Sequence, residues 1–131
     1  MPIELKLLLW SVALTVLQVV IAAFGTVTRV GLPVAVGNRA NFPVLEGWVG
    51  RAHRAHRNML ECLVLFTALV FVAQASGKFN AMTALGAEIF FWARVGYAVV
   101  YLAGIPWLRT LLWTAAIVGL ALIFVALLPL H

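Results

Sequence analysis

The sequence predicts an all-α membrane protein built as a bundle of four transmembrane helices. Apolar residues make up 65% of the chain and charged residues only 10%, whereas an ordinary globular domain carries roughly 25% charged residues. Because so few charges cannot solvate a protein surface, lipid must cover most of it. The chain also contains four apolar stretches, and each is close to the length of about 20 residues that a helix needs to span a membrane. We assign residues 1–131 to a single transmembrane domain.

The first two spans are predicted over about residues 5–27 and 47–75. Only Lys6 is charged in the first span, and it lies near the end. The loop between the two spans is punctuated by glycines, prolines and asparagines, which favour irregular backbone. The second span has very polar early turns, GRAHRAHRNMLE, and apolar later turns. We therefore expect this helix to project from the membrane before it crosses.

The last two spans are predicted over about residues 80–103 and 106–128. Gly104 and Pro106 interrupt the apolar sequence between them and predict a tight break. The beginning of the chain shows no obvious small-residue cleavage site of the signal-peptide kind, so we expect the first span to be retained. No internal repeat or low-complexity segment is present.

Lysine and arginine placement predicts the orientation of the chain. Most of the basic residues are predicted to lie on one side of the membrane. The loop between the first two spans and the polar helix start after it hold Arg29, Arg39, Arg51, Arg54 and Arg57, and the break between the last two spans adds Arg109. The opposite side holds only Lys6 and Lys78. We expect the first and third loops to be cytoplasmic and both termini to face away, with a bacterial inner membrane as the suggested location. Long apolar runs interrupt the basic residues, so the net charge of +5 does not indicate nucleic-acid binding.

The most distinctive pattern is RAHRAHRNMLE at residues 51–61. Side chains three and four residues apart share a helix face. One stripe of the second span therefore holds Arg51, Arg54, Asn58 and Glu61, with Arg57 alongside. A basic cluster that contacts lipid headgroups would explain the arginines. It would not explain Asn58 and Glu61, which continue the stripe toward the membrane.

The third span places Arg94, Tyr97 and Tyr101 on one face. An arginine within a span is costly, so Arg94 should face the bundle interior or a wet cavity and have a partner. A structural ion pair would account for it, with Glu61, or as a weaker candidate Glu88, as the carboxylate. Tyr101 could equally belong to an interfacial aromatic belt.

These groups together predict an anion pocket at the cytoplasmic ends of the second, third and fourth spans. The planar fork of arginine recognises carboxylates bidentately, and Glu61 would suit a ligand amine. The set fits a small zwitterion with excess negative charge beside an apolar co-substrate. Arg109 by itself could be only an orientation anchor. His53 and His56 lack a further ligand set, so we predict no metal site.

The run RAHRNMLE at residues 54–61 resembles the signature of the MAPEG proteins, which are membrane-associated proteins in eicosanoid and glutathione metabolism. The pair Arg94 and Tyr101 in the third span is similar to the family, as is the run PWLRTLLW at residues 106–113. The resemblance covers nearly the whole chain in length, number of spans and their order.

The resemblance implies a homotrimer that binds glutathione between neighbouring subunits. The glutathione-binding residues that it implies are Arg54, Arg57, Asn58, Glu61, Arg94 and Tyr101, with Arg29 as a looser match. Arg109 would be catalytic, because it matches the family's arginine that stabilises the thiolate. A thiol with a pKa near 8.5 is mostly protonated at neutral pH, and a neighbouring guanidinium favours the nucleophilic thiolate.

The resemblance thus predicts a glutathione-binding integral membrane enzyme. Its reaction would transfer glutathione to apolar electrophiles, reduce lipid hydroperoxides, or both. One alternative is a non-catalytic lipid-binding scaffold of the same family, although such a protein has no evident need for the whole residue set. Another is a small transporter subunit with Arg94 as its intramembrane charge. Nothing in the first span is comparable, and no carboxylate lies convincingly at the middle of the membrane.

Overall fold

The computed structural model describes residues 1–37 and 45–129 of the chain. These residues form the helices α1 (Ile3–Val30), α2 (Leu32–Val36), α3 (Gly47–Ser76), α4 (Ala81–Ala103) and α5 (Pro106–Leu127). All of them except α2 are long and apolar enough to cross a membrane. The predicted all-helical fold with four long apolar helices is therefore confirmed, and the chain is an integral, multi-pass membrane protein. Arg39 lies outside the described residues.

The long helices differ from the predicted spans only at their ends, but the first loop contains a helix that was not predicted. Segment 32–36 was expected to be irregular, and this expectation is wrong, because it forms α2. Gly31 has a φ of 82°, which ends α1 and turns the chain. Pro33 then lies in the first turn of α2, where its fixed φ suits a helix and its missing N–H costs nothing.

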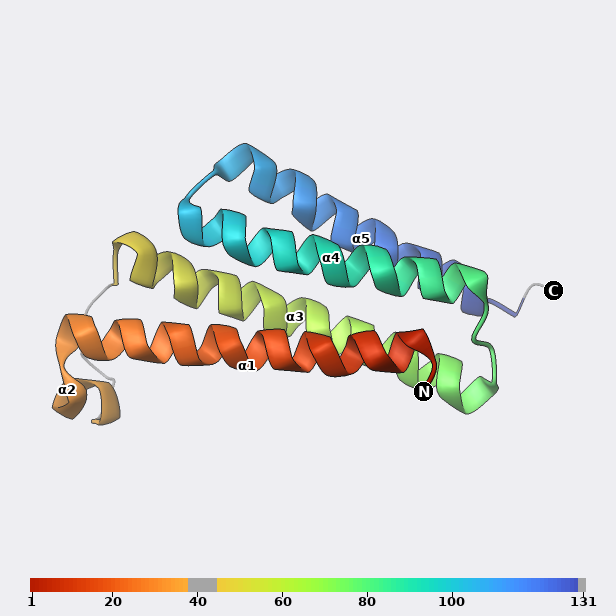
Figure 1. Ribbon diagram of the computed structural model, residues 1–131, viewed down its shortest axis with the longest axis horizontal. Coiled ribbons are helices and arrows are strands. Elements are labelled where there is room, and N and C mark those ends of the chain that lie inside the picture. The colour runs from red at the N-terminus through yellow and green to blue at the C-terminus, as the bar shows by residue number, and fades with distance from the viewer. Residues whose placement is uncertain (38–44, 130–131) are drawn as a thin grey trace.

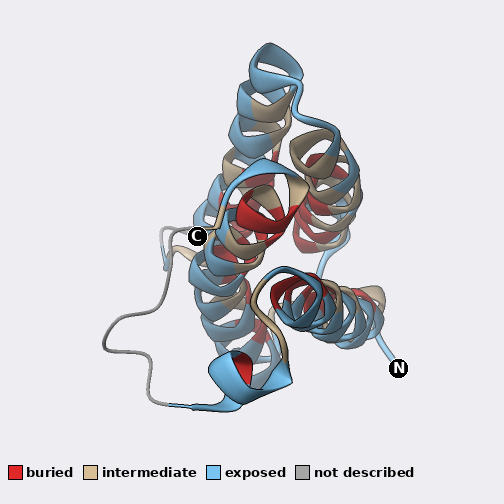
Figure 2. Cartoon of the chain, turned by 90° about the vertical axis from the view of Figure 1, so that its left-hand side faces the viewer, coloured by how far each residue is buried: buried red, intermediate tan, exposed pale blue. Residues whose placement is uncertain are grey.

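The four long helices lie side by side, with α5 packed along α4 and α1 packed against α3 and α4 (Figure 1). The N-terminal end of α1 and the C-terminal end of α5 lie at the same end of the bundle. Buried residues are on the helix sides that face one another, and exposed residues are on the outer sides (Figure 2). Stacked rings of Phe66 and Phe90, with centroids 4.3 Å apart, lie in the apolar core.

Helices α4 and α5 approach each other closely at Gly86 and Gly119. A Cβ atom on Gly86 would lie 2.6 Å from the Gly119 carbonyl oxygen, and one on Gly119 would lie 2.6 Å from the Gly86 carbonyl oxygen. Small residues allow such close packing of membrane helices. The contact makes α4 and α5 a tightly packed pair, which fixes the side chains of one helix relative to those of the other.

Candidate functional site

Arg94 lies inside the bundle with only 1% of its surface exposed. Its Nη1 donates to Asn58 Oδ1 at 2.8 Å and contacts Cys62 Sγ at 3.8 Å, while its Nε contacts Met59 Sδ at 3.4 Å. The guanidinium carbon lies 4.0 Å from the centre of the Tyr97 ring. Its Nη2 has no hydrogen-bond partner in the described part of the chain. The buried cation is therefore held by an amide, sulfur atoms and a ring, and one of its donors stays free.

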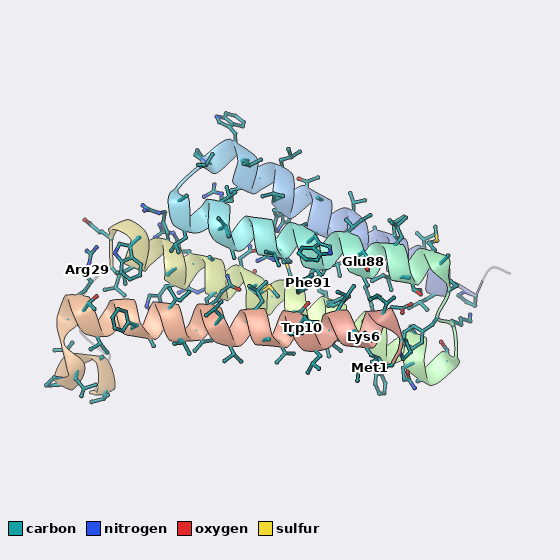
Figure 3. The ribbon with its side chains drawn as sticks, in the orientation of Figure 1. Met1, Lys6, Trp10, Arg29, Glu88 and Phe91 are labelled. Carbon is teal, nitrogen blue, oxygen red and sulfur yellow. The ribbon has the colours of Figure 1, made fainter. Side chains whose placement is uncertain are left out.

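Neither candidate carboxylate neutralises Arg94. Glu61 is exposed, and no ion pair between it and Arg94 occurs in residues 45–129. Glu88 instead accepts a hydrogen bond of 3.0 Å from Trp92 Nε1, on an exposed part of α4 (Figure 3). The ion pair considered from the sequence is therefore wrong for this chain on its own. The charge of Arg94 is therefore not compensated by any carboxylate in the described part of the chain.

Tyr101 brings together side chains from three helices. Arg54 Nε, on α3, donates to the Tyr101 hydroxyl oxygen at 3.2 Å. The guanidinium carbon of Arg109, on α5, lies 4.9 Å from the centre of the Tyr101 ring, within the range of a cation–π contact. The Tyr97 ring is 5.4 Å away on the same helix. Tyr101 thus orients two arginines, one through its hydroxyl group and one through its ring.

A cavity of about 280 Å³ lies beside Tyr101. It is lined by Asn58, Tyr97, Tyr101, Arg109, Thr110 and Trp113. Because Asn58 Oδ1 accepts a hydrogen bond from Arg94, the amide nitrogen of Asn58 remains free to donate toward the cavity. The structure therefore places a donor-rich, positively charged cavity where the second, third and fourth spans meet.

The sequence profile of the MAPEG family matches residues 7–129 of the chain. The chain belongs to the MAPEG family. No match was found among curated proteins or among solved structures. MAPEG proteins commonly bind glutathione, and many are glutathione-dependent enzymes. The family resemblance predicted from the sequence is thus confirmed.

In this MAPEG protein, some of the predicted ligand residues lie at the cavity and others do not. Asn58, Tyr101 and Arg109 line the cavity, and Arg54 and Arg94 contact its walls. The remaining three predicted residues, Arg57, Glu61 and Arg29, do not line it. Arg57 and Glu61 are exposed on α3, and Arg29 is exposed in the last turn of α1 (Figure 3).

Arg51 faces α4 as Arg54 and Asn58 do, in agreement with its spacing, but it does not line the cavity. Its Nε donates to the Leu102 carbonyl oxygen at 3.1 Å, in the last turn of α4. A cation at the C-terminal end of a helix is favourable because the last carbonyl groups lack partners within the helix. Arg51 therefore joins the start of α3 to the end of α4, and it helps to hold the turn that leads to Arg109.

Sequence reasoning missed some polar residues of this MAPEG chain. Trp113 lines the cavity, although it was not among the predicted site residues. Glu4, near the start of α1, is 3% exposed and accepts a hydrogen bond from Thr83 Oγ1. Thr26 Oγ1 lies 2.5 Å from His53 Nε2. The signal was present, because the polar residues of α1 recur at the three- and four-residue spacing of one helix face.

Proposed function

We propose that this MAPEG protein is a glutathione-dependent membrane enzyme. The proposed reaction transfers glutathione to apolar electrophiles, reduces lipid hydroperoxides, or both. The observation that carries the proposal is the arrangement around Tyr101, which holds Arg54 and Arg109 beside the cavity that Asn58 lines. Arginine forks and an amide donor are the groups that recognise carboxylates.

The chemistry of the cavity fits glutathione as a ligand. Within residues 1–37 and 45–129, the buried Nη2 of Arg94 has no hydrogen-bond partner and no carboxylate lines the cavity. A buried cation without a counter-charge is unfavourable, so a ligand with excess negative charge would stabilise it. Glutathione carries two carboxylates and one amine, which gives it such an excess. In this proposal Arg54, Asn58, Arg94 and Tyr101 hold the tripeptide.

Arg109 is proposed to act on the thiol. Bound glutathione supplies a thiol whose deprotonated form is the nucleophile. Arg109 is partly exposed, lines the cavity and keeps its guanidinium beside the Tyr101 ring. A fixed positive charge favours a thiolate over a thiol, so Arg109 lowers the fraction of ligand that stays protonated. Apolar substrates partition into the bilayer around the helices, and this proximity raises the rate of encounter.

Arg57, Glu61 and Arg29 are proposed to act in an assembly of several copies. Arg57 and Glu61 are exposed on α3, beside exposed Leu60 and Val64. Exposed charges on an apolar helix are costly in a membrane, so a neighbouring subunit or its bound ligand should cover them. We propose a homotrimer in which Glu61 binds the amine of glutathione and the arginines bind its carboxylates across the subunit boundary.

Ultraviolet difference absorbance tests the proposal. The detergent-purified protein is titrated with glutathione at neutral pH, and the thiolate band is recorded. S-methylglutathione is the matched control, because it retains the carboxylates and amine but has no ionisable thiol. A saturable thiolate band that appears with glutathione and not with S-methylglutathione supports the proposal. Turnover of chlorodinitrobenzene or cumene hydroperoxide then distinguishes transfer from peroxide reduction.

The same titration can also contradict the proposal. Absence of a thiolate band, together with calorimetry that detects no glutathione binding, contradicts the proposal. That result would favour the non-catalytic lipid-binding scaffold as the function of the chain. Counterflow of labelled solute into liposomes that contain the protein would favour the transporter subunit instead.

A further inference from the structure

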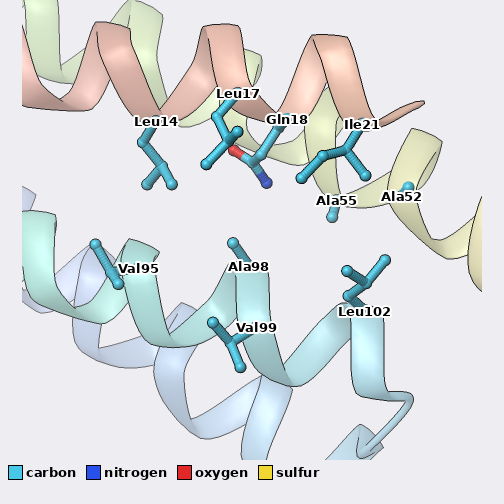
Figure 4. A pocket seen from close by; sticks show the side chains of 10 residues that line it. All are labelled: Leu14, Leu17, Gln18, Ile21, Ala52, Ala55, Val95, Ala98, Val99 and Leu102. Atoms are coloured by element: carbon cyan, nitrogen blue, oxygen red, sulfur yellow. The ribbon is translucent and has the colours of Figure 1, made fainter. Parts of the chain in front are cut away.

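A second cavity, of about 230 Å³, lies between α1, α3 and α4 (Figure 4). The α4 residues that line it include Val95, Val99 and Leu102. Successive residues of a helix are about 100° apart around its axis, so these three point away from the side of α4 that carries Tyr97. The two cavities therefore lie on different sides of α4, and the second one is separate from the proposed glutathione site.

Gln18 is the one polar residue among those that line this second cavity. It lies near the middle of α1 and is 7% exposed. Its side chain reaches from α1 into the space between α1 and α4, where Ala98 lies opposite (Figure 4). Gln18 Oε1 is buried without a hydrogen-bond partner in residues 1–37 and 45–129. The cavity thus contains a buried amide oxygen that the described part of the protein leaves unpaired.

Neighbouring polar residues on the same face of α1 are satisfied. Ser11 Oγ donates to the Leu7 carbonyl oxygen at 2.7 Å, and Thr15 Oγ1 donates to the Ser11 carbonyl oxygen at 2.8 Å. Short hydroxyl side chains reach the preceding turn of their own helix in this way. The Gln18 amide extends beyond that turn into the cavity. In the hydrocarbon region no bulk water is present to pair with it, so a bound molecule that carries a hydrogen-bonding group would supply the missing partner.

We infer that this cavity binds an uncharged fatty alcohol or another lipid with a single hydroxyl group beside its hydrocarbon chain. A hydroxyl both donates and accepts hydrogen bonds, so it can pair with either end of the Gln18 amide. The terminal torsion of glutamine is broad, which allows the amide to turn toward the cavity. At about 30 Å³ for each water-sized group, the cavity has room for roughly eight such groups, which corresponds to a segment of hydrocarbon chain.

The lining excludes the main alternatives. A plain hydrocarbon chain would fill the space but leave the Gln18 amide unpaired. A carboxylate or phosphate would lose its hydration without gaining a counter-charge, because no charged side chain of residues 1–37 or 45–129 lines the cavity. Alanines at positions 52, 55 and 98 form part of the wall, and their small side chains leave the space that the ligand would occupy.

Photolabelling of the full-length protein in detergent tests this inference. The probe is a diazirine analogue of 1-decanol, and the competitors are 1-decanol and decane. We expect mass spectrometry to find the label within residues 14–21 and 95–102. We also expect 1-decanol to compete about tenfold more strongly than decane, in proportion to one hydrogen bond. Equal competition by the two compounds would overturn the inference and indicate a groove filled by bulk lipid.

Substitution of the glutamine supplies the matched comparison. Gln18→Leu should weaken competition by 1-decanol about tenfold and leave competition by decane unchanged. Gln74→Leu, which alters an exposed glutamine of α3, should change neither. Ala98→Leu narrows the cavity while Gln18 itself is retained, and it should reduce labelling of both segments. Circular dichroism checks that each variant is folded. If labelling of folded Gln18→Leu or Ala98→Leu matched the unaltered protein, the inference would be wrong.

Discussion

Arg94 and Asn58 join α4 to α3 through a hydrogen bond of 2.8 Å in an otherwise largely apolar core. The bond has a structural and a chemical consequence. It satisfies one donor of a buried cation, and it occupies the amide oxygen of Asn58, so that the amide nitrogen of this cavity-lining residue stays available as a donor. Removal of either side chain should therefore affect both the stability of the bundle and its affinity for an anionic ligand.

Asn58→Ala should lower the free energy of unfolding by about 1 to 3 kcal/mol, because the Arg94 guanidinium loses its closest hydrogen-bond acceptor. The losses of unfolding free energy in Asn58→Ala and Arg94→Leu should not add up in the double variant, and the coupling energy should be about 1.5 to 3 kcal/mol. Unfolding by sodium dodecyl sulfate in mixed micelles measures both quantities. Lys6→Ala, at an exposed position near the start of α1, is the control and should change stability by about 0.5 kcal/mol or less. Simple additivity would contradict the coupling.

Tyr101→Phe should raise the KM for glutathione about two- to tenfold, with a smaller effect on kcat. The substitution removes the hydroxyl that accepts from Arg54, which corresponds to about 0.5 to 1.5 kcal/mol, but it keeps the ring beside Arg109. Tyr101→Leu removes the ring as well and should also lower kcat, because Arg109 loses a cation–π contact of about 0.5 to 1 kcal/mol. Identical kinetics for the two variants would show that the ring does not position Arg109.

Arg109→Ala should retain glutathione binding by calorimetry and lose most of the thiolate band. The remaining cations, Arg54 and Arg94, still attract the carboxylates, whereas the charge proposed to stabilise the thiolate is absent. Arg109→Lys should recover part of the band, since the charge remains but the planar fork does not. A full thiolate band in Arg109→Ala would rule out Arg109 as the catalytic residue.

Gly86→Ala should destabilise the protein by about 1 to 3 kcal/mol, because the new Cβ would overlap the Gly119 carbonyl oxygen and push α4 away from α5. Gly96→Ala is the matched control on the same helix. A Cβ there would meet the flexible end of Leu112 at 3.2 Å, and a small shift of that side chain relieves the contact. The melting temperatures of the two variants in detergent check the prediction, which fails if they are equal.

Thr83→Val should destabilise the N-terminal end of α4 by about 1 to 3 kcal/mol. Thr83 Oγ1 donates to buried Glu4 and accepts from the Asn80 backbone N–H at 2.9 Å, which closes the capping box of α4. Valine keeps the shape but removes both hydrogen bonds. Thr83→Ser preserves the hydroxyl and should remain within about 1 kcal/mol of the unaltered protein. If the two variants lost similar amounts of stability, the effect would be due to packing and not to the hydrogen bonds.

The long helices could be predicted because each apolar residue along a span adds to the evidence that the span crosses the membrane. Each span is an apolar run of sufficient length, and Gly77 and Gly104 mark where α3 and α4 end, both with positive φ. Helix α2 escaped prediction because it has only five residues, too few to show a helical period. Pro33 and Gly31 are also usual in irregular loops.

The candidate site was predicted only in part, because spacing gives the face of a helix but not the neighbour of that face. The spacing of Arg94, Tyr97 and Tyr101 correctly placed them on one side of α4, where the two tyrosines line the cavity. The structural alternative for Arg94 gave it a carboxylate partner, whereas the structure supplies Asn58 and sulfur atoms. That choice depends on how α3 rotates against α4. The rotation follows from packing across the interface, and a single helix pattern does not contain it.

The turn between α4 and α5 consists of Gly104 and Ile105 alone. An added residue that was absorbed into α5 would rotate every later side chain by about 100° around the helix axis. Arg109 would then leave Tyr101, even though no residue of the cavity had been substituted. The length of this turn therefore sets the angular phase of α5, and insertions or deletions there should be far more damaging than replacement of Ile105, whose side chain is exposed.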